Sequence, residues 1–127
     1  MKLYTADFPP NTRKIKYLVQ VKGLDLKDIH NLEIIDMDLL KGDQKTPEFT
    51  AINPFQLLPV LVLDDGTVLS DSQAVCEYLD SHLQGNGKQV MGSDPVQRAQ
   101  ITAMTRNAEF HVLYNLMLAF QHGHPAR

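Results

Sequence analysis

The stretch from Asn53 to Ser72 constrains the fold more than any other part of the 127-residue chain. It holds an unbroken apolar run from Val60 to Leu63, followed by the turn Asp64-Asp65-Gly66. Such a run is typical of a strand buried on both faces, and Asp-Gly is a strong hairpin signal because glycine readily adopts positive φ. We therefore expect a strand, a tight turn and a returning strand at Thr67 to Leu69.

Two positions in this stretch are expected to leave backbone groups unpaired. Pro59 comes directly before the buried strand and cannot donate to a sheet ladder, so the N–H and C=O of its neighbour Leu58 should be free near the surface. Asp71 and Ser72 open a helical pattern. The first N–H groups of a helix have no partner within it and carry a partial positive charge. Together the two features predict a receptor for a small peptide-like anion.

The chain before this stretch alternates strands and helices. Lys2 to Thr5 and Leu32 to Met37 are the expected strands. A helix capped by Asn11 or Thr12 lies between them, and a short helix or turn at Pro47 to Ile52 follows. Strands separated by a helix form a parallel pair, while the hairpin adds an antiparallel strand. The predicted fold is α/β, with a thioredoxin-like mixed four-stranded sheet in the order βαβαββα.

Composition divides the chain into two parts. Residues 84–93 contain three glycines and few large apolar residues, so they are interpreted as a linker after a thioredoxin-like domain at 1–83. Asp94-Pro95 is a favourable helix start for residues 94–127. Apolar residues then recur along one helical stripe, formed by Ile101, Met104, Ala108, Val112, Leu116 and Phe120.

Composition also excludes several classes of protein. With 43% hydrophobic and 21% charged residues the chain is typical of a globular domain, and its net charge of -3 without a basic cluster argues against nucleic-acid binding. No apolar run approaches the roughly 20 residues of a membrane span. The single Cys76 cannot form an internal disulfide, which favours the cytoplasm. His122-Gly123-His124 lies in a tail that is predicted to be disordered and lacks a third ligand, so no metal site is expected.

The stretch resembles the glutathione-binding half of a cytosolic glutathione transferase of bacterial type. The family pattern is N-P-x-G-K-V-P-x-L followed by D-G-x-x-L-x-E-S-x-A-I-x-x-Y-L. It is matched by Asn53, Pro54, Pro59, Leu61, Asp65, Gly66, Leu69, Ser72, Ala74, Tyr78 and Leu79. The departures are Gln56 for Gly, Leu57 for Lys or Gln, Leu58 for Val, and Asp71 for Glu.

The resemblance runs from Met1 to about Phe120. It covers an N-terminal thioredoxin-like domain and the first helix of the C-terminal helical domain. The chain thus resembles a family member cut off after that helix. We accordingly expect an incomplete electrophile pocket and low activity.

The resemblance implies a role for each part of a glutathione site. Leu58, before Pro59, would pair its backbone with the cysteinyl unit. Ser72 would bind the γ-glutamyl carboxylate through its hydroxyl and N–H, and Asp71 would bind the ammonium. Gln44 would face the glycine carboxylate. Considered alone, Asp71 and Ser72 are also explained as helix caps, and Gln44 as a solvated loop residue.

The residue that would activate the glutathione thiol departs from the family pattern. Family members use Tyr at the end of the first strand, or Ser or Cys at the first helix start, and Thr5 and Pro9 occupy these places here. The run P-N-T-R-K-I at residues 10–15 resembles that of bacterial glutathione-dependent disulfide reductases, which place the Asn near the sulfur. Asn11 would lower the thiol pKa together with the helix N-terminus. His111, in an E-F-H run, resembles a His that faces the sulfur from the helical domain. Asn11 could instead cap its helix, and His111 could be an ordinary surface residue.

The predicted function is a glutathione transferase that conjugates glutathione to a soft electrophile or uses it in thiol–disulfide chemistry. Glutathione is the expected cosubstrate, with no metal, no nucleic acid and no membrane partner. A homodimer is expected through the Asp94 helix and the Ser72 helix, because an exposed apolar stripe marks an interface. The alternative is a non-catalytic binding domain of the same fold, which the missing Tyr, Ser or Cys favours. Cys76 is interpreted as a small buried hydrophobe.

Overall fold

The computed structural model describes residues 1–123, without the side chains of Phe120 and Gln121. The chain divides into two compact units, Met1–Val90 and a second that begins at Met91. No helix within residues 1–123 is both long enough and apolar enough to cross a membrane.

The first unit is built on a mixed four-stranded sheet in the order β2-β1-β3-β4. The strands are β1 (Lys2–Thr5), β2 (Glu33–Asp36), β3 (Val60–Val62) and β4 (Val68–Leu69). Strand β1 is parallel to β2 and antiparallel to β3, and β3 is antiparallel to β4. The predicted α/β class and mixed sheet are confirmed.

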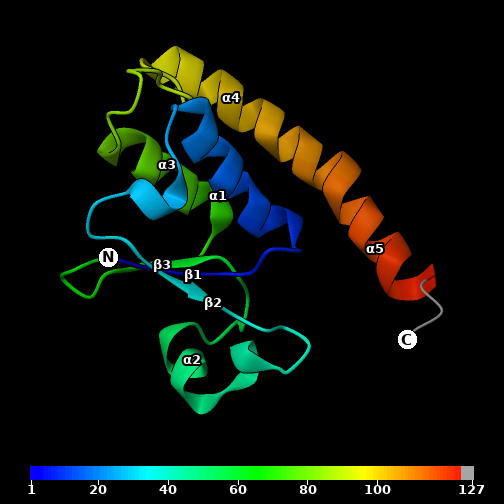
Figure 1. Cartoon of the computed structure of the whole chain (residues 1–127). Coiled ribbons are helices and arrows are strands. Elements are labelled where there is room, and N and C mark those ends of the chain that lie inside the picture. The colour runs from blue at the N-terminus through cyan, green and yellow to red at the C-terminus, as the bar shows by residue number, and fades with distance from the viewer. Residues whose placement is uncertain (124–127) are drawn as a thin grey trace. The chain divides into compact units, whose positions relative to one another are not determined.

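Helices cover both faces of this sheet. Figure 1 shows α1 (Pro10–Val21) and α3 (Ser72–His82) on one side of it and α2 (Pro47–Ile52) on the other. Two single-turn 3₁₀ helices, Leu26–Asp28 and Asp43–Lys45, lie in the connections. An apolar layer therefore lies on each face of the sheet, one beneath α1 and α3 and the other beneath α2.

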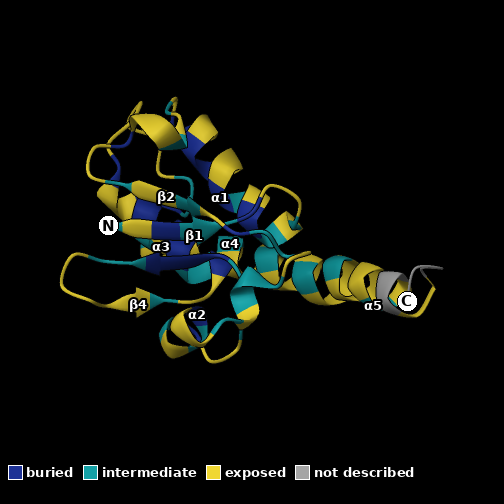
Figure 2. Cartoon of the chain, turned by 60° about the horizontal axis from the view of Figure 1, so that its bottom comes forward, coloured by how far each residue is buried: buried dark blue, intermediate teal, exposed yellow. Residues whose placement is uncertain are grey.

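The alternation of side chains along the strands explains these two layers. Leu3 and Leu61 are register partners with no exposed surface, and they face α1 and α3. Tyr4 and Val60 are the next partners and face the opposite side, where they pack in a cluster with Phe49 of α2. Figure 2 shows the buried residues concentrated along β1, β3 and the inner side of α1. The sheet is thus held from both sides, which fixes the loops at its ends.

The start of α1 corrects a prediction. Neither Asn11 nor Thr12 caps the helix, because it already begins at Pro10, with Pro9 in the cap position and no side-chain cap bond. Proline suits the first helical position because its ring fixes φ and its missing N–H would have no partner there. The Thr12 hydroxyl donates backwards instead, to the C=O groups of Ala6 and of Pro9, the latter over 2.8 Å. The Asn11 amide is therefore not used in capping.

A buried ion pair joins the far ends of α1 and α3. Lys22 has no exposed surface, and its Nζ donates to the Asp80 carboxylate over 2.8 Å and to the C=O groups of Asp80 and Lys88. The N–H of Asn86 donates to the Lys22 C=O over 2.8 Å, and the N–H of Val90 donates to the Asp80 carboxylate over 3.0 Å. The first part of the predicted linker is thereby hydrogen-bonded to the first unit.

The second unit is helical. It comprises α4 (Pro95–Ala108), a π turn at Glu109–Leu113 and α5 (Tyr114–Gly123). Asp94 caps α4, since its carboxylate accepts from the N–H groups of Val96 and Gln97. A π turn holds one residue more than an α turn, which rotates the following residues by about 100° and interrupts the predicted regular stripe.

The C-terminal end of the described chain also differs from the prediction. His122 and Gly123, predicted to lie in a disordered tail, belong to α5. His124 and the side chain of Phe120, the last member of the predicted stripe, lie outside the described residues.

Candidate functional site

The backbone around Leu58 has the form that the sequence predicts. The Leu58–Pro59 peptide bond is cis, Pro59 is buried and Leu58 is half-buried. Neither the N–H nor the C=O of Leu58 is hydrogen-bonded within residues 1–123. One donor and one acceptor of the same residue are therefore available to an extended ligand.

The loop before Leu58 is held from inside. Asn53 is buried, and its Nδ2 donates to the Leu57 C=O over 2.9 Å. Gln56 has φ +57, a conformation that normally favours glycine, and its side chain donates to the Thr50 hydroxyl over 3.2 Å. The family pattern has Gly at this position, so the substitution keeps the backbone conformation. These bonds hold the position of the Leu58 backbone.

The start of α3 supplies further hydrogen-bonding groups. Asp71 is the N-cap, and one carboxylate oxygen accepts from the N–H groups of Gln73 and Ala74 over 2.8 and 3.1 Å. Its other oxygen makes no hydrogen bond to the described residues. Ser72 is buried as the first helical residue, a position whose N–H has no intrahelical partner. Capping by Asp71 thus leaves free groups on both residues.

A lysine that sequence reasoning missed lies beside Ser72. Lys14 of α1 is half-buried, and its Nζ donates to the Ser72 hydroxyl oxygen over 3.3 Å. Lys14 belongs to the P-N-T-R-K-I run, but this contact depends on how α1 packs against α3. No sequence spacing would have predicted it.

Gln44 lies in the 3₁₀ helix Asp43–Lys45, after β2. Its amide oxygen is buried and has no hydrogen-bond partner among the described residues. A buried acceptor without a donor is unusual and costly. To bind a carboxylate, the amide would have to present its nitrogen, because a carboxylate offers no donor.

The candidates for thiol activation differ in what their side chains do. Asn11 is half-buried at the second position of α1, and its amide makes no hydrogen bond within residues 1–123. The Thr12 hydroxyl is buried and already donates to backbone carbonyls. Burial raises the pKa of the Cys76 thiol to about 11, although the nearby Lys14 charge acts in the opposite direction. Cys76 is therefore an inert thiol, and Asn11 remains available.

His111 belongs to the second unit, unlike the other predicted site residues. It is exposed and lies in the π turn Glu109–Leu113, and its C=O accepts from the Asn115 amide over 2.9 Å. The Arg106 guanidinium lies over the neighbouring Phe110 ring at 4.9 Å from its centroid. Single π turns inside α-helices are frequent at functional sites.

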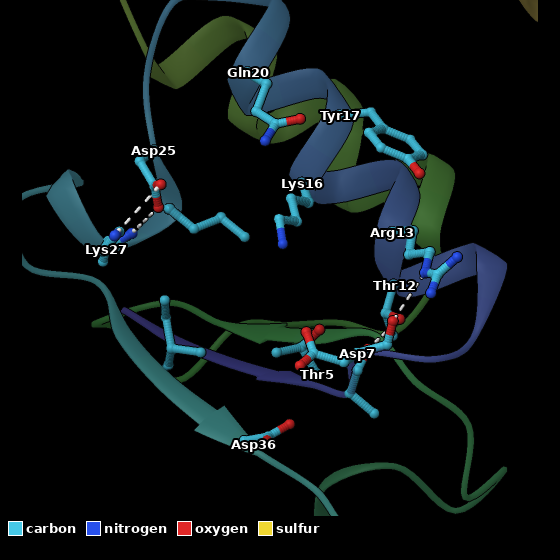
Figure 3. Close-up of a pocket in the computed structure, with 13 residues that line it drawn as sticks. Thr5, Asp7, Thr12, Arg13, Lys16, Tyr17, Gln20, Asp25, Lys27 and Asp36 are labelled. Carbon is cyan, nitrogen blue, oxygen red and sulfur yellow. Dashed lines mark hydrogen bonds and ion pairs between the residues drawn. The ribbon is translucent and has the colours of Figure 1, made fainter.

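A cavity of about 790 Å³ in the first unit is lined by none of the predicted glutathione-binding residues. It lies between the outer side of α1 and the edge strand β2 (Figure 3). Lys16 points into it, and Asp36 lies on the opposite wall. Asp25 pairs with Lys27 over 3.8 Å at its rim. This hollow is formed by the side of α1 that faces away from the Lys14–Ser72 contact.

Comparison with known proteins identifies the family. The model for "Glutathione S-transferase, N-terminal domain" matches residues 3–87, nearly the whole first unit. The chain belongs to the glutathione S-transferase family. The resemblance of the Asn53–Ser72 stretch is thereby confirmed.

Individual relatives agree with this assignment. Glutathione S-transferase 2 of Saccharomyces cerevisiae is 30% identical over 125 residues, which are 98% of this chain and 51% of that protein. Maleylacetoacetate isomerase of Pseudomonas aeruginosa is 30% identical over 132 residues, covering 98% of this chain and 58% of that protein. The crystal structure of Gtt2 from Saccharomyces cerevisiae has 28% identity and a TM-score of 0.82, and the match covers 98% of this chain and 57% of that one. The chain spans about half the length of the curated relatives that it matches.

Proposed function

We propose that this member of the glutathione S-transferase family binds glutathione along Leu58, Asp71 and Ser72. The observation that carries the proposal is the free N–H and C=O of Leu58, on the residue before Pro59, in the same unit as the open start of α3. An extended cysteinyl backbone would pair with Leu58 as one short antiparallel bridge. This pairing would direct the γ-glutamyl end toward α3.

Each end of the peptide has a proposed partner. The Ser72 hydroxyl and N–H would donate to the γ-glutamyl carboxylate, and the free oxygen of Asp71 would accept from the ammonium. The amide nitrogen of Gln44 would donate to the glycine carboxylate. The buried amide oxygen of Gln44 has no donor among the described residues, so turning the amide to present its nitrogen would break no hydrogen bond of that oxygen.

The proposed chemistry uses the thiolate of glutathione as a nucleophile. In conjugation, a C–S bond forms at a soft electrophile and the leaving group departs with its electron pair. In thiol–disulfide exchange, an S–S bond forms as another breaks. Asn11 and the positive end of α1 would stabilise the thiolate, and His111 would donate to it or shape the electrophile pocket. Relatives named as transferases and as an isomerase support this reaction class.

Retention on immobilised glutathione, followed by assays of arylation and of disulfide reduction, tests the proposal. Asn11→Ala is expected to raise the pKa of the bound thiol and slow turnover, whereas Thr5→Val should leave both unchanged. A chain that is not retained contradicts the glutathione site. An unchanged thiol pKa in Asn11→Ala contradicts only the role of Asn11.

A second candidate is a non-catalytic glutathione-binding module. The Thr12 hydroxyl is engaged with backbone carbonyls and the Cys76 thiol is buried, so neither replaces the usual activating side chain. Glutathione that binds with the thiol pKa of free glutathione would favour this candidate over the enzyme.

The proposed assembly is a homodimer in the cytoplasm. Met104, Val112 and Leu116 of the second unit are exposed, at 71%, 57% and 62%, and such apolar surface normally marks an interface. A second copy offers a self-complementary cover through α4 and α3. A buried, unpaired Cys76 and the use of glutathione fit a reducing compartment. A stable monomer at micromolar concentration in sedimentation would contradict the dimer.

A further inference from the structure

Asn53 is a buried residue whose backbone and side chain are both hydrogen-bonded. It is 1% exposed. Its N–H donates to the Phe49 C=O over 2.8 Å, and its C=O accepts from the Gln56 N–H over 2.9 Å. Its Oδ1 accepts from the Phe55 N–H over 3.2 Å, and its Nδ2 donates to the Leu57 C=O over 2.9 Å. The side chain thus joins two backbone groups that lie on either side of Gln56.

The bond to Leu57 acts on the peptide group that Leu57 shares with Leu58. This group is trans, so the Leu57 C=O and the Leu58 N–H lie in one plane and point in opposite directions. Within residues 1–123, Asn53 Nδ2 is the only hydrogen-bond donor to that C=O. The Leu57 side chain is 63% exposed and does little to hold the group. Asn53 therefore fixes the direction of the free Leu58 N–H, and it polarises the group so that this N–H becomes a stronger donor.

We propose that Asn53 is a positioning residue for glutathione binding, which acts through the Leu57–Leu58 peptide group and does not touch the ligand. This role rests on the proposed function, in which the Leu58 N–H donates to the cysteinyl C=O of glutathione. Asparagine suits the position because its short side chain both accepts and donates hydrogen bonds. Aspartate would keep the acceptor for Phe55 and lose the donor for Leu57. Serine would keep a weaker acceptor, and its hydroxyl lies one bond nearer the backbone.

The test compares two ligands in the whole chain by calorimetry. One ligand is glutathione, and the other is its thioamide analogue, in which sulfur replaces the cysteinyl carbonyl oxygen and accepts hydrogen bonds more weakly. The variants are Asn53→Ser and Asn53→Asp, and the thermal midpoint of each is measured in parallel.

Asn86 provides matched controls, Asn86→Ser and Asn86→Asp. Its side chain makes the same pair of bonds, because Nδ2 donates to the Val21 C=O over 3.0 Å and Oδ1 accepts from the Lys88 N–H over 3.1 Å. These bonds lie at the last residue of α1 and do not involve the Leu57–Leu58 peptide group.

Asn53→Ser should weaken glutathione binding about tenfold, because the Leu58 N–H is no longer held in the direction of its acceptor. Binding of the thioamide should fall less than about threefold, since its bond to the same N–H is already weak. Asn53→Asp should show the same preference for loss with glutathione. Both Asn86 variants should bind each ligand within about twofold of the unaltered chain.

If neither Asn53 variant folds, the proton signal of the Asn53 amide in the unaltered chain provides the test. Donation from the Leu58 N–H to glutathione should polarise the peptide group further and shift the bonded Nδ2 proton downfield, more than the thioamide does. Equal shifts with the two ligands would overturn the proposal.

The outcomes that contradict the role of Asn53 differ from those that contradict the glutathione site. Equal losses for both ligands in Asn53→Ser would show that Asn53 only stabilises the loop, and no loss would show that it has no part in binding. An unaltered chain that binds the two ligands equally would show that the Leu58 N–H does not pair with the cysteinyl unit. Absence of any glutathione binding would overturn this inference and the proposed function together.

Discussion

Two lysines of α1 reach across to α3, and their surroundings differ. Lys14 contacts Ser72 at the start of α3, and Lys22 contacts Asp80 near its end; 58 residues separate the partners along the chain in both cases. The two helices therefore run parallel in one register. Lys22 is fully buried and its Nζ makes three hydrogen bonds, whereas Lys14 is half-buried and its Nζ donates to the Ser72 hydroxyl oxygen.

The Lys22 contact is structural, whereas the Lys14 contact lies beside the candidate binding site. At the Lys22 end the ion pair and the carbonyls around it satisfy one another, so there is no group left for a ligand. At the Lys14 end the Ser72 hydroxyl hydrogen, an oxygen of Asp71 and the first N–H of α3 have no intrahelical or capping partner. The same helix pair thus stabilises the unit at one end and presents hydrogen-bonding groups at the other.

The largest loss of stability is expected from breaking the buried ion pair between Lys22 and Asp80. Asp80→Ala leaves the Lys22 charge buried without its carboxylate and should lower the free energy of unfolding by about 3–5 kcal/mol. Urea unfolding followed by circular dichroism measures it. Glu33→Gln is the control, because it breaks the exposed Lys2–Glu33 pair and should cost less than about 1 kcal/mol. Similar small losses in both variants would show that the Lys22 end does not stabilise the unit.

A pH effect is expected from Cys76, which lies on α3 between Ser72 and Asp80. Burial raises the pKa of its thiol from the ordinary 9.0 to about 11, so the folded state holds the proton more tightly than the unfolded state. The resulting stability is complete below pH 9 and is lost as the pH rises to 11, by about 2–3 kcal/mol. The pH dependence of the urea midpoint, compared between the unaltered chain and Cys76→Ala, measures it. Identical slopes in the two proteins would contradict the prediction.

A smaller loss of stability is expected from a substitution at Gly85, where the backbone passes close to the Lys22 carbonyl group. A Cβ at Gly85 would lie 2.4 Å from the Lys22 carbonyl oxygen, whereas a Cβ at Gly87 would meet nothing within 4 Å. Both glycines have positive φ, so alanine costs about 1–2 kcal/mol at either position through the backbone. Gly85→Ala should cost at least about 1 kcal/mol more, because the backbone must also move. Equal thermal midpoints of the two variants would show that the close approach does not matter.

The parts of the molecule that could be predicted from the sequence are those governed by local rules. The apolar run at Val60 to Leu63 and the turn at Gly66 predicted the hairpin, because alternation and positive φ are properties of short segments. The free backbone of Leu58 followed from Pro59, and the start of α3 from Asp71. Topological rules then fixed the parallel pairing of β1 and β2.

The remainder depended on packing that no local pattern encodes. Lys22 stands between Val21 and Gly23 and would be assigned to the surface, since lysine is almost never fully buried unless it is paired. Its partner Asp80 is distant in sequence, as Ser72 is from Lys14. The cap of α1 was predicted wrongly at Asn11 or Thr12, because Pro9-Pro10 starts the helix earlier. The π turn at Glu109–Leu113 likewise gave no signal in the regular spacing.

The central claim is that the open end of α1 and α3 binds glutathione, and calorimetry on Ser72→Ala tests it most directly. The unaltered chain should bind glutathione, and the variant should bind it more weakly by about 1–3 kcal/mol, because the carboxylate loses the hydroxyl donor. The variant should keep its thermal midpoint within a few degrees, since Asp71 still caps α3. Unchanged glutathione affinity in a folded Ser72→Ala protein would contradict the account.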